Sequence, residues 1–178
     1  GAGSRWDSDG FIYVGYTGTG TLDVNDGGLV TSAYGGIGTD PNGTGTVTVS
    51  GADSQWSVSE DLAVGAYGQG DLTISAGGSV RGHNIYVGGF DVATFDADPN
   101  EVPQGTGTVT VTGAGSELDV HLRNLFVGYT GTGEVNIADG GLATTHAAYV
   151  GHEADANGVV TVSGDGSTWE TDSLFVAH

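Results

Sequence analysis

The sequence predicts an all-β fold, a right-handed parallel β-solenoid of about seven three-stranded coils. Three observations support this prediction: one unit recurs along the chain, apolar and polar residues alternate within each unit, and 35 of the 178 residues are glycine. Alternation with period two is typical of strands that bury one face, and frequent glycine marks tight turns. Repetition on this scale indicates stacked coils that form a single domain over residues 1–178.

The repeated unit has a longer and a shorter version, and the two alternate. The longer version reads GTGTVTVSGADSQWSVSEDLAVG and the shorter one GTGTLDVNDGGLVTSAYGGIG. Residues 1–15 are a longer unit that lacks its first strand, and residues 89–104 are an inserted loop. The longer units occupy residues 43–65, 105–128 and 158–178, and the shorter units occupy residues 18–38, 68–88 and 131–151.

Each unit contains three short extended pieces that glycine separates. In the first piece two apolar residues flank a polar one, as Val47 and Val49 do. The middle piece of most longer units carries a tryptophan, such as Trp56, and the last piece again alternates, as at Leu62 and Val64. We therefore expect three strands with glycine corners to close one coil.

Equivalent pieces recur in the same order, which favours stacked coils over hairpins. A single coil cannot bury its inward face, but coils stacked about 4.8 Å apart form a continuous apolar column with parallel ladders. An antiparallel meander is the alternative, because corners such as GTG could close hairpins. Hairpins would place unlike pieces opposite each other. Right-handed coiling follows the general rule for parallel crossovers.

The chain is strongly acidic, with a formal net charge of −19 from 22 acidic residues against three arginines. Nucleic acid is not expected as a partner, because neutralising phosphates requires a basic surface. No stretch is apolar enough to insert into a membrane. The sequence has no cysteine, so disulfides are excluded.

The pattern GTGTVTVSGxxSxW, followed by LxVG and GxGxLxIxxGGxV, resembles the tandem repeats of autotransporter passenger domains and of bacterial exported proteins with PEP-CTERM sorting signals. The resemblance covers nearly the whole chain. It implies a β-solenoid stalk that is extracellular or displayed on the bacterial cell surface, in a group that includes adhesins and biofilm matrix components. The chain departs from the pattern at Leu118, which replaces tryptophan, and at Ala177 and His178, which replace the closing glycine.

Acidic and amide residues alternate in the loops that precede the first piece of three units: TDPNG, FDADPNEVPQG and HEADANG. Alternating oxygen ligands followed by a glycine turn form the first half of a calcium loop, so calcium is the one cofactor that the sequence suggests. The alternative is that these residues are simply good turn formers. The candidate calcium ligands are Asp40, Asn42, Asp96, Asp98, Asn100, Glu153, Asp155 and Asn157.

The central residue of the last piece points away from the core and is aromatic in most units. A contiguous row of such residues forms an apolar patch of the kind that marks an interface. Lateral packing against another solenoid is the preferred interpretation; sugar stacking and simple cross-strand pairing are the alternatives. The predicted row comprises Tyr13, Tyr86, Phe126, Tyr149 and Phe175.

Other patterns suggest weaker hypotheses. His83, His121 and His146 recur at similar positions and could hold zinc or copper, although surface histidines are the simpler interpretation. Asp71 and Glu134 lie two units apart, at about the separation of an inverting hydrolase pair. The basic residues that would hold an anionic sugar are missing, and no catalytic triad is recognisable, so no enzymatic activity is expected. Outward threonines suggest an ice-binding face, but acidic residues interrupt it.

Together these patterns predict a structural component of an extracellular bacterial fibre, sheath or surface stalk. We expect it to self-associate by end-to-end or lateral contacts of the solenoid. The main alternative is an adhesin segment that binds a glycan or another surface ligand. A polysaccharide-degrading enzyme is the third and weakest alternative.

Overall fold

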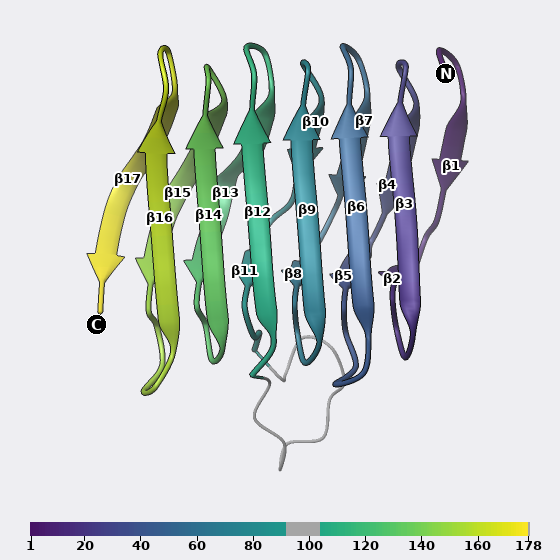
Figure 1. Cartoon of the computed structure of the whole chain (residues 1–178). Helices are drawn as coiled ribbons and strands as arrows, with labels where there is room; N and C mark the ends of the chain where they lie inside the picture. The colour runs from purple at the N-terminus through teal and green to yellow at the C-terminus, as the bar shows by residue number, and fades with distance from the viewer. Residues whose placement is uncertain (92–103, 178) are drawn as a thin grey trace.

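The computed structural model describes residues 1–91 and 104–177 of the chain. This part of the chain contains 17 strands and no helix (Figure 1). Every strand pair is parallel, and the strands stack as a β-solenoid of about six turns. The predicted all-β parallel solenoid is confirmed, and the antiparallel meander is excluded.

Two sheets form the opposite walls of the solenoid. The six-stranded sheet consists of the first piece of each unit: β3 (Thr19–Asn25), β6 (Thr44–Ser50), β9 (Gln69–Ser75), β12 (Thr106–Thr112), β14 (Thr132–Ala138) and β16 (Asn157–Ser163). The eleven-stranded sheet contains the other two pieces: β1 (Arg5–Asp7), β2 (Phe11–Val14), β4 (Leu29–Ser32), β5 (Tyr34–Ile37), β7 (Gln55–Val58), β8 (Leu62–Val64), β10 (Ser79–Arg81), β11 (Ile85–Val87), β13 (Glu117–Val127), β15 (Leu142–Val150) and β17 (Thr168–Val176).

The coil is right-handed, as the path of the chain in Figure 1 shows. Each coil runs upward in the six-stranded sheet at the front, crosses the upper edge and returns downward in the sheet behind. Successive coils advance from right to left, from β3 to β16. An upward path in front combined with an advance to the left is a right-handed coil, in agreement with the rule for parallel crossovers.

The prediction of three separate strands holds only for the first four coils. There the middle and last pieces are distinct, as β7 and β8 are, with a bend at residues 59–61 between them. In the last three coils the two pieces join into the single strands β13, β15 and β17. The bend in the third coil reads Ser-Glu-Asp and contains no glycine. Glycine is present at this bend only in the first and fourth coils, as Gly10 and Gly82, so the expected third glycine corner is not a general feature of the coil.

The core is a column of inward side chains between the two sheets. Val47, Val49 and Leu62 are completely buried, as the period-two pattern predicts. Burial of each such side chain stabilises the fold by about 1.5–3 kcal/mol. Trp56 is also fully buried, and its Nε1 donates a hydrogen bond of 3.1 Å to the hydroxyl of Ser32 in the preceding coil. The polar end of the tryptophan is thus satisfied across the coil boundary.

Serines of the longer coils join neighbouring coils at the upper edge. The hydroxyl of Ser116 donates to the carbonyl of Thr112 at 2.7 Å and accepts the N–H of Gly77, in the preceding coil, at 3.1 Å. One side chain thereby holds its own turn and the adjacent one. Two other serines accept equivalent bonds: Ser54 from Gly27 at 3.0 Å and Ser167 from Gly140 at 3.1 Å.

Backbones approach closely at the lower edge, where one coil passes into the next. Gly65 has a φ of +68°, and a Cβ there would collide with the carbonyl of Thr106. A Cβ on Gly107 would collide with the carbonyl oxygen of Val64. Only glycine fits this corner, which explains why the GxG sequence opens the first strand of so many units.

Candidate functional site

Outward aromatic residues of the last strand piece stack in register along the eleven-stranded sheet. Tyr86 pairs with Phe126, Phe126 with Tyr149, and Tyr149 with Phe175 in the parallel ladder. Their ring centroids lie 4.9, 4.9 and 4.8 Å apart, with interplanar angles of 7°, 15° and 10°. We call these four residues the aromatic stack.

Tyr13, the fifth residue of the predicted row, lies apart from the aromatic stack. Gly36 and Ala63 occupy the two ladder positions between Tyr13 and Tyr86. The Tyr13 ring stacks on Phe11 at 5.2 Å and leans over Gly36, where a Cβ would lie 2.8 Å from the ring. The structure therefore brings four of the five predicted residues together.

A second set of rings, which strand periodicity does not indicate, covers the aromatic stack. Tyr129 meets Tyr86 and Phe126 edge to face, at centroid distances of 5.3 and 5.1 Å. His152 lies against Phe126 and Tyr149 at 5.3 and 5.1 Å, and it stacks on Tyr129 at 4.9 Å. We call Tyr129 and His152 the corner rings, because both lie at the lower edge of the solenoid.

The corner rings bury part of the aromatic stack. Phe126, which contacts both corner rings, is only 8% exposed. Phe175 lies in the last coil and is 37% exposed; the residue of that coil that corresponds to a corner ring, His178, lies outside the described residues. The same burial raises the pKa of the Tyr129 hydroxyl, and the carboxylates of Asp91 and Glu153 raise it further.

A signal for the corner rings is present in the sequence. Each follows the glycine that ends the last piece, as in VGYTG at 127–131 and VGHE at 150–153. Equivalent aromatics occur in VGYTG at 14–18, VGAYG at 64–68 and VGGF at 87–90. Aligning the units through their corners, and not only through their strands, reveals this second aromatic column.

The geometry limits what the aromatic stack can bind. A sugar needs a free ring face, but the faces between Tyr86 and Phe175 are in contact with other rings of the chain. A lateral partner would contact the edge of Tyr149 and the exposed Phe175, because Tyr86 and Phe126 are buried. Lateral packing at this surface remains a prediction.

The first candidate calcium loop uses its carboxylate within its own turn. The N–H of Asn42 donates to Asp40 Oδ1 at 3.1 Å, and the N–H of Gly43 donates to the Asp40 carbonyl at 2.7 Å. This is an Asx turn, the role that the turn-forming alternative assigns to these residues.

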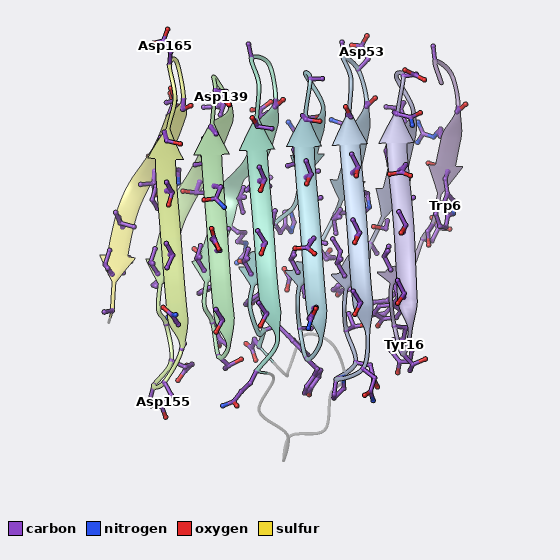
Figure 2. The ribbon with its side chains drawn as sticks, viewed as in Figure 1. Trp6, Tyr16, Asp53, Asp139, Asp155 and Asp165 are labelled. Carbon is purple, nitrogen blue, oxygen red and sulfur yellow. The ribbon has the colours of Figure 1, made fainter. Side chains whose placement is uncertain are left out.

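The candidate ligands of the third loop, Glu153, Asp155 and Asn157, lie at the lower edge just before and at the start of β16. Figure 2 shows Asp155 at the lower tip, directed away from the molecule, and its φ is 68°. The candidates Asp96, Asp98 and Asn100 lie outside the described residues. Within residues 1–91 and 104–177, no group of three or more His, Cys, Asp or Glu side chains is placed to hold a metal. Calcium binding stays a prediction.

Further acidic residues gather at the upper edge, where no site was predicted. Asp53, Asp139 and Asp165 lie there at the tips of the turns (Figure 2). Asp53 and Asp139 have φ values of 67° and 50°, a left-handed conformation that aspartate tolerates better than most residues. These residues shape the turns and leave the upper edge negatively charged.

The predicted histidine row is divided between two pairs of coils. His83 Nδ1 lies 3.7 Å from Glu60 Oε2, and His146 Nδ1 lies 2.9 Å from Asp172 Oδ2. Each of these histidines faces a carboxylate from a neighbouring coil. The side chain of His121 lies outside the described residues.

Asp71 and Glu134 lie on the exposed outer face of the six-stranded sheet. Both are in register with Thr108, which separates them, so they are two strand spacings apart, or about 10 Å. Glu134 accepts a hydrogen bond of 2.8 Å from the amide of Asn136. The absence of enzymatic activity stays a prediction.

Residues 1–91 and 104–177 include no helix with the length and apolar character needed to cross a membrane.

Comparison with known proteins shows similarity to two bacterial sequences. The chain is 32% identical over 123 residues to the adhesin BmaC autotransporter of Brucella suis biovar 1 (strain 1330). It is 28% identical over 139 residues to the uncharacterized protein YuaQ of Escherichia coli (strain K12). These alignments cover 67% and 74% of this chain. No protein-family model and no solved structure matches it.

The chain spans only 3% and 9% of the length of these two relatives. The similarity supports the autotransporter part of the predicted resemblance and does not bear on the PEP-CTERM part. Together with the solenoid fold, it points weakly to a secreted, surface-exposed protein. The chain is therefore a β-solenoid with partial similarity to an autotransporter adhesin.

Proposed function

We propose that this chain is a rod-like segment of a bacterial surface adhesin of the autotransporter type, where it acts as an extracellular stalk. The observation that carries the proposal is the unbroken parallel pairing of successive coils in both sheets, in a chain similar to an autotransporter adhesin. A stack of coils in which each contacts its neighbours is stiff and extends in one dimension. Such a segment holds binding surfaces away from the cell.

The charge of the chain is consistent with a stalk that stays separate from its neighbours. The net charge is −19, and acidic residues lie at the tips of both edges. Like charges on parallel rods repel each other and keep a repetitive β-protein soluble. Salt screens this repulsion beyond about 8 Å at physiological ionic strength.

A fibre formed by end-to-end stacking is the second candidate function. The end coils of this chain expose apolar side chains, with Trp6 51% and Val176 65% exposed. Strands β1 and β17 each have a single ladder partner within the described residues. Strand edges of this kind can be covered by a further coil, which a longer chain or a second copy could supply.

Surface display tests the stalk proposal. The chain would be fused between an epitope tag and an autotransporter barrel in Escherichia coli. We expect antibody to label the tag on intact cells and external protease to leave the solenoid uncut, because its backbone is paired in ladders. Retention of the tag inside the cell, or rapid cleavage within the solenoid, would contradict the proposal.

Electron microscopy of the isolated 178-residue chain separates the stalk from the fibre. We expect discrete rods at physiological salt. Filaments that disappear in a Trp6→Asp, Val176→Asp double variant, and persist in a Thr48→Asp control on the outer sheet face, would instead favour the fibre.

A further inference from the structure

A groove of about 540 Å³ runs along the eleven-stranded sheet where the first coils bend. Bends of five successive coils contribute to it, from Ser8 in the first to Leu122 in the fifth. Because coils are spaced about 4.8 Å apart, the groove follows the solenoid axis and is longer than one coil is thick. Its volume lies in the ordinary range for ligand sites.

The groove exists because the strands of the first four coils are interrupted. Small residues occupy those bends, including Ala33, Ser59 and Gly82. From the fifth coil onward the strand β13 continues through this position, and Leu122, which is 57% exposed, closes the groove. The change from broken to continuous strands therefore creates a site of defined length.

Arg81 is held in place at one side of the groove. Its Nε donates to Asp119 Oδ2 at 2.7 Å, and the Asp119 side chain is buried, whereas that of Arg81 is half-exposed. Among the described residues, Asp119 is the one hydrogen-bond partner of the Arg81 side chain. The two terminal amino groups of the guanidinium have no partner among these residues. A buried carboxylate that anchors one end of a guanidinium prepares the other end for a ligand.

Other polar groups of the groove also have unused hydrogen-bonding capacity. The hydroxyls of Ser57 and Ser59 have no protein partner among residues 1–91 and 104–177. His83 presents a ring whose Nδ1 is 3.7 Å from Glu60, and its Nε2 makes no bond within the same residues. The lining thus offers hydroxyl, guanidinium and imidazole groups in a row.

The backbone at the bends is already used. The N–H groups of Ser59, Glu60 and His83 donate to carbonyls of the preceding coil, each at 2.9 Å. An extended peptide, which binds sheets through main-chain hydrogen bonds, would find few partners here. A ligand of this groove must bond to side chains.

We propose that this groove binds a stretch of neutral, unbranched polysaccharide that lies along the solenoid axis. Such a chain carries hydroxyls that both donate and accept, which matches the serine, arginine and histidine side chains of the lining. The net charge of −19 disfavours a polyanion in the same place. The inference uses the proposed surface display only to explain where the protein would meet a polysaccharide. The groove itself is present in the folded chain whether or not the chain is displayed on a cell.

Titration with defined oligosaccharides tests the proposal. Cellohexaose, maltohexaose and laminarihexaose would be added to the ¹⁵N-labelled chain, with hexagalacturonic acid as a charged comparison. We expect at least one neutral hexamer to shift the amides of residues 31–33, 57–59 and 81–83 saturably, with weaker shifts for the charged one. Absence of such shifts with all three neutral hexamers, or stronger binding of the charged one, would overturn the proposal.

Two groove variants and one matched control sharpen the test. Ser57→Leu fills the groove, and Arg81→Gln removes the guanidinium. We expect each variant to weaken binding about tenfold or more, which is the effect of losing one hydrogen bond to a charged group. Thr48→Leu places the same side chain on the opposite sheet of the same coil and should leave binding unchanged. Equal affinity in all three variants contradicts the groove. Melting curves identify a variant that has lost its fold. The surface-display experiment tests the stalk proposal, and its result does not depend on whether the groove binds an oligosaccharide.

Discussion

At the scale of single residues, the conformations of the upper turns explain which side chains occupy them. Asp26, Ala76 and Asp139 occupy equivalent positions in the shorter coils, with φ values of 51°, 51° and 50°. Aspartate tolerates the left-handed region, because its short side chain can bond locally, but alanine gains nothing there. Ala76 is therefore a position of unrelieved strain.

Replacing this alanine should stabilise the protein. We expect Ala76→Gly to raise the free energy of unfolding by about 0.5–1 kcal/mol, because glycine adopts positive φ without a Cβ clash. Urea denaturation followed by circular dichroism measures the change. Ala52→Gly, at a nearby exposed turn position without positive φ, is the control and should lower stability slightly. A decrease for both variants would show that Ala76 is not strained.

Individual site residues were predictable to different degrees. The aromatic stack could be predicted from the sequence because its members occupy the outward-facing position between two inward apolar residues of the same strand. Tyr129 and His152 were missed because the period-two alternation that marks strands does not extend to the corners, where the aromatic residues appear only when whole units are aligned. The burial of Tyr86 and Phe126 could not be predicted for the same reason: the rings that cover them come from those corners. Serine substitutions at Tyr86 or Phe126 would consequently perturb packing as well as any interface.

At the scale of elements, the difference between broken and continuous strands shapes the surface. The prediction of three pieces per coil was correct in the first four coils and wrong in the last three. The fifth coil reads HLRNLF at 121–126, and the strand continues through this segment, although the interrupted bend of the third coil, Ser-Glu-Asp, has no glycine or proline either. Strand β13 has an irregular register between Val120 and Asn124, so the bend is absorbed within one strand.

The lower corner is the element least tolerant of change. We expect Gly107→Ala to lower the free energy of unfolding by about 3 kcal/mol or more, since its Cβ would collide with the backbone of Val64. Gly18→Ala is the matched control, because a Cβ there would meet open space. Thermal and urea unfolding of both variants measure the difference. Similar stabilities would show that the corner can relax around a side chain.

At the scale of the whole molecule, the architecture was predictable because every level of the sequence repeats. Period-two alternation defined the strands, glycine defined the edges, and the recurrence of like pieces required parallel stacking. Function was less predictable, since a repeat built for stacking constrains inward residues and leaves the outer ones free to vary. The groove depends on the interrupted strands of four successive coils and on Leu122 of the fifth, a relation visible only after the coils are aligned in space.

The calcium prediction is tested on the whole solenoid, because the two candidate loops that the structure describes, at residues 39–43 and 152–158, both lie along its lower edge. We expect millimolar calcium to raise the melting temperature relative to excess chelator, by preferential binding to the folded state. Magnesium at the same concentration is the control, since it requires a smaller octahedral site. Identical melting curves in calcium and chelator would leave turn formation as the role of Asp40 and its equivalents.

The constant register of the six-stranded sheet has a consequence for inheritance. Strands β3, β6 and β9 begin at residues 19, 44 and 69, a steady interval of 25 residues. An in-frame duplication of two such intervals preserves the alternation of longer and shorter coils and adds about 10 Å to the rod. Unequal recombination between repeats can thus lengthen or shorten the protein in whole steps without disturbing any existing contact except at the junction. Selection can therefore adjust the length of the rod without changing its fold.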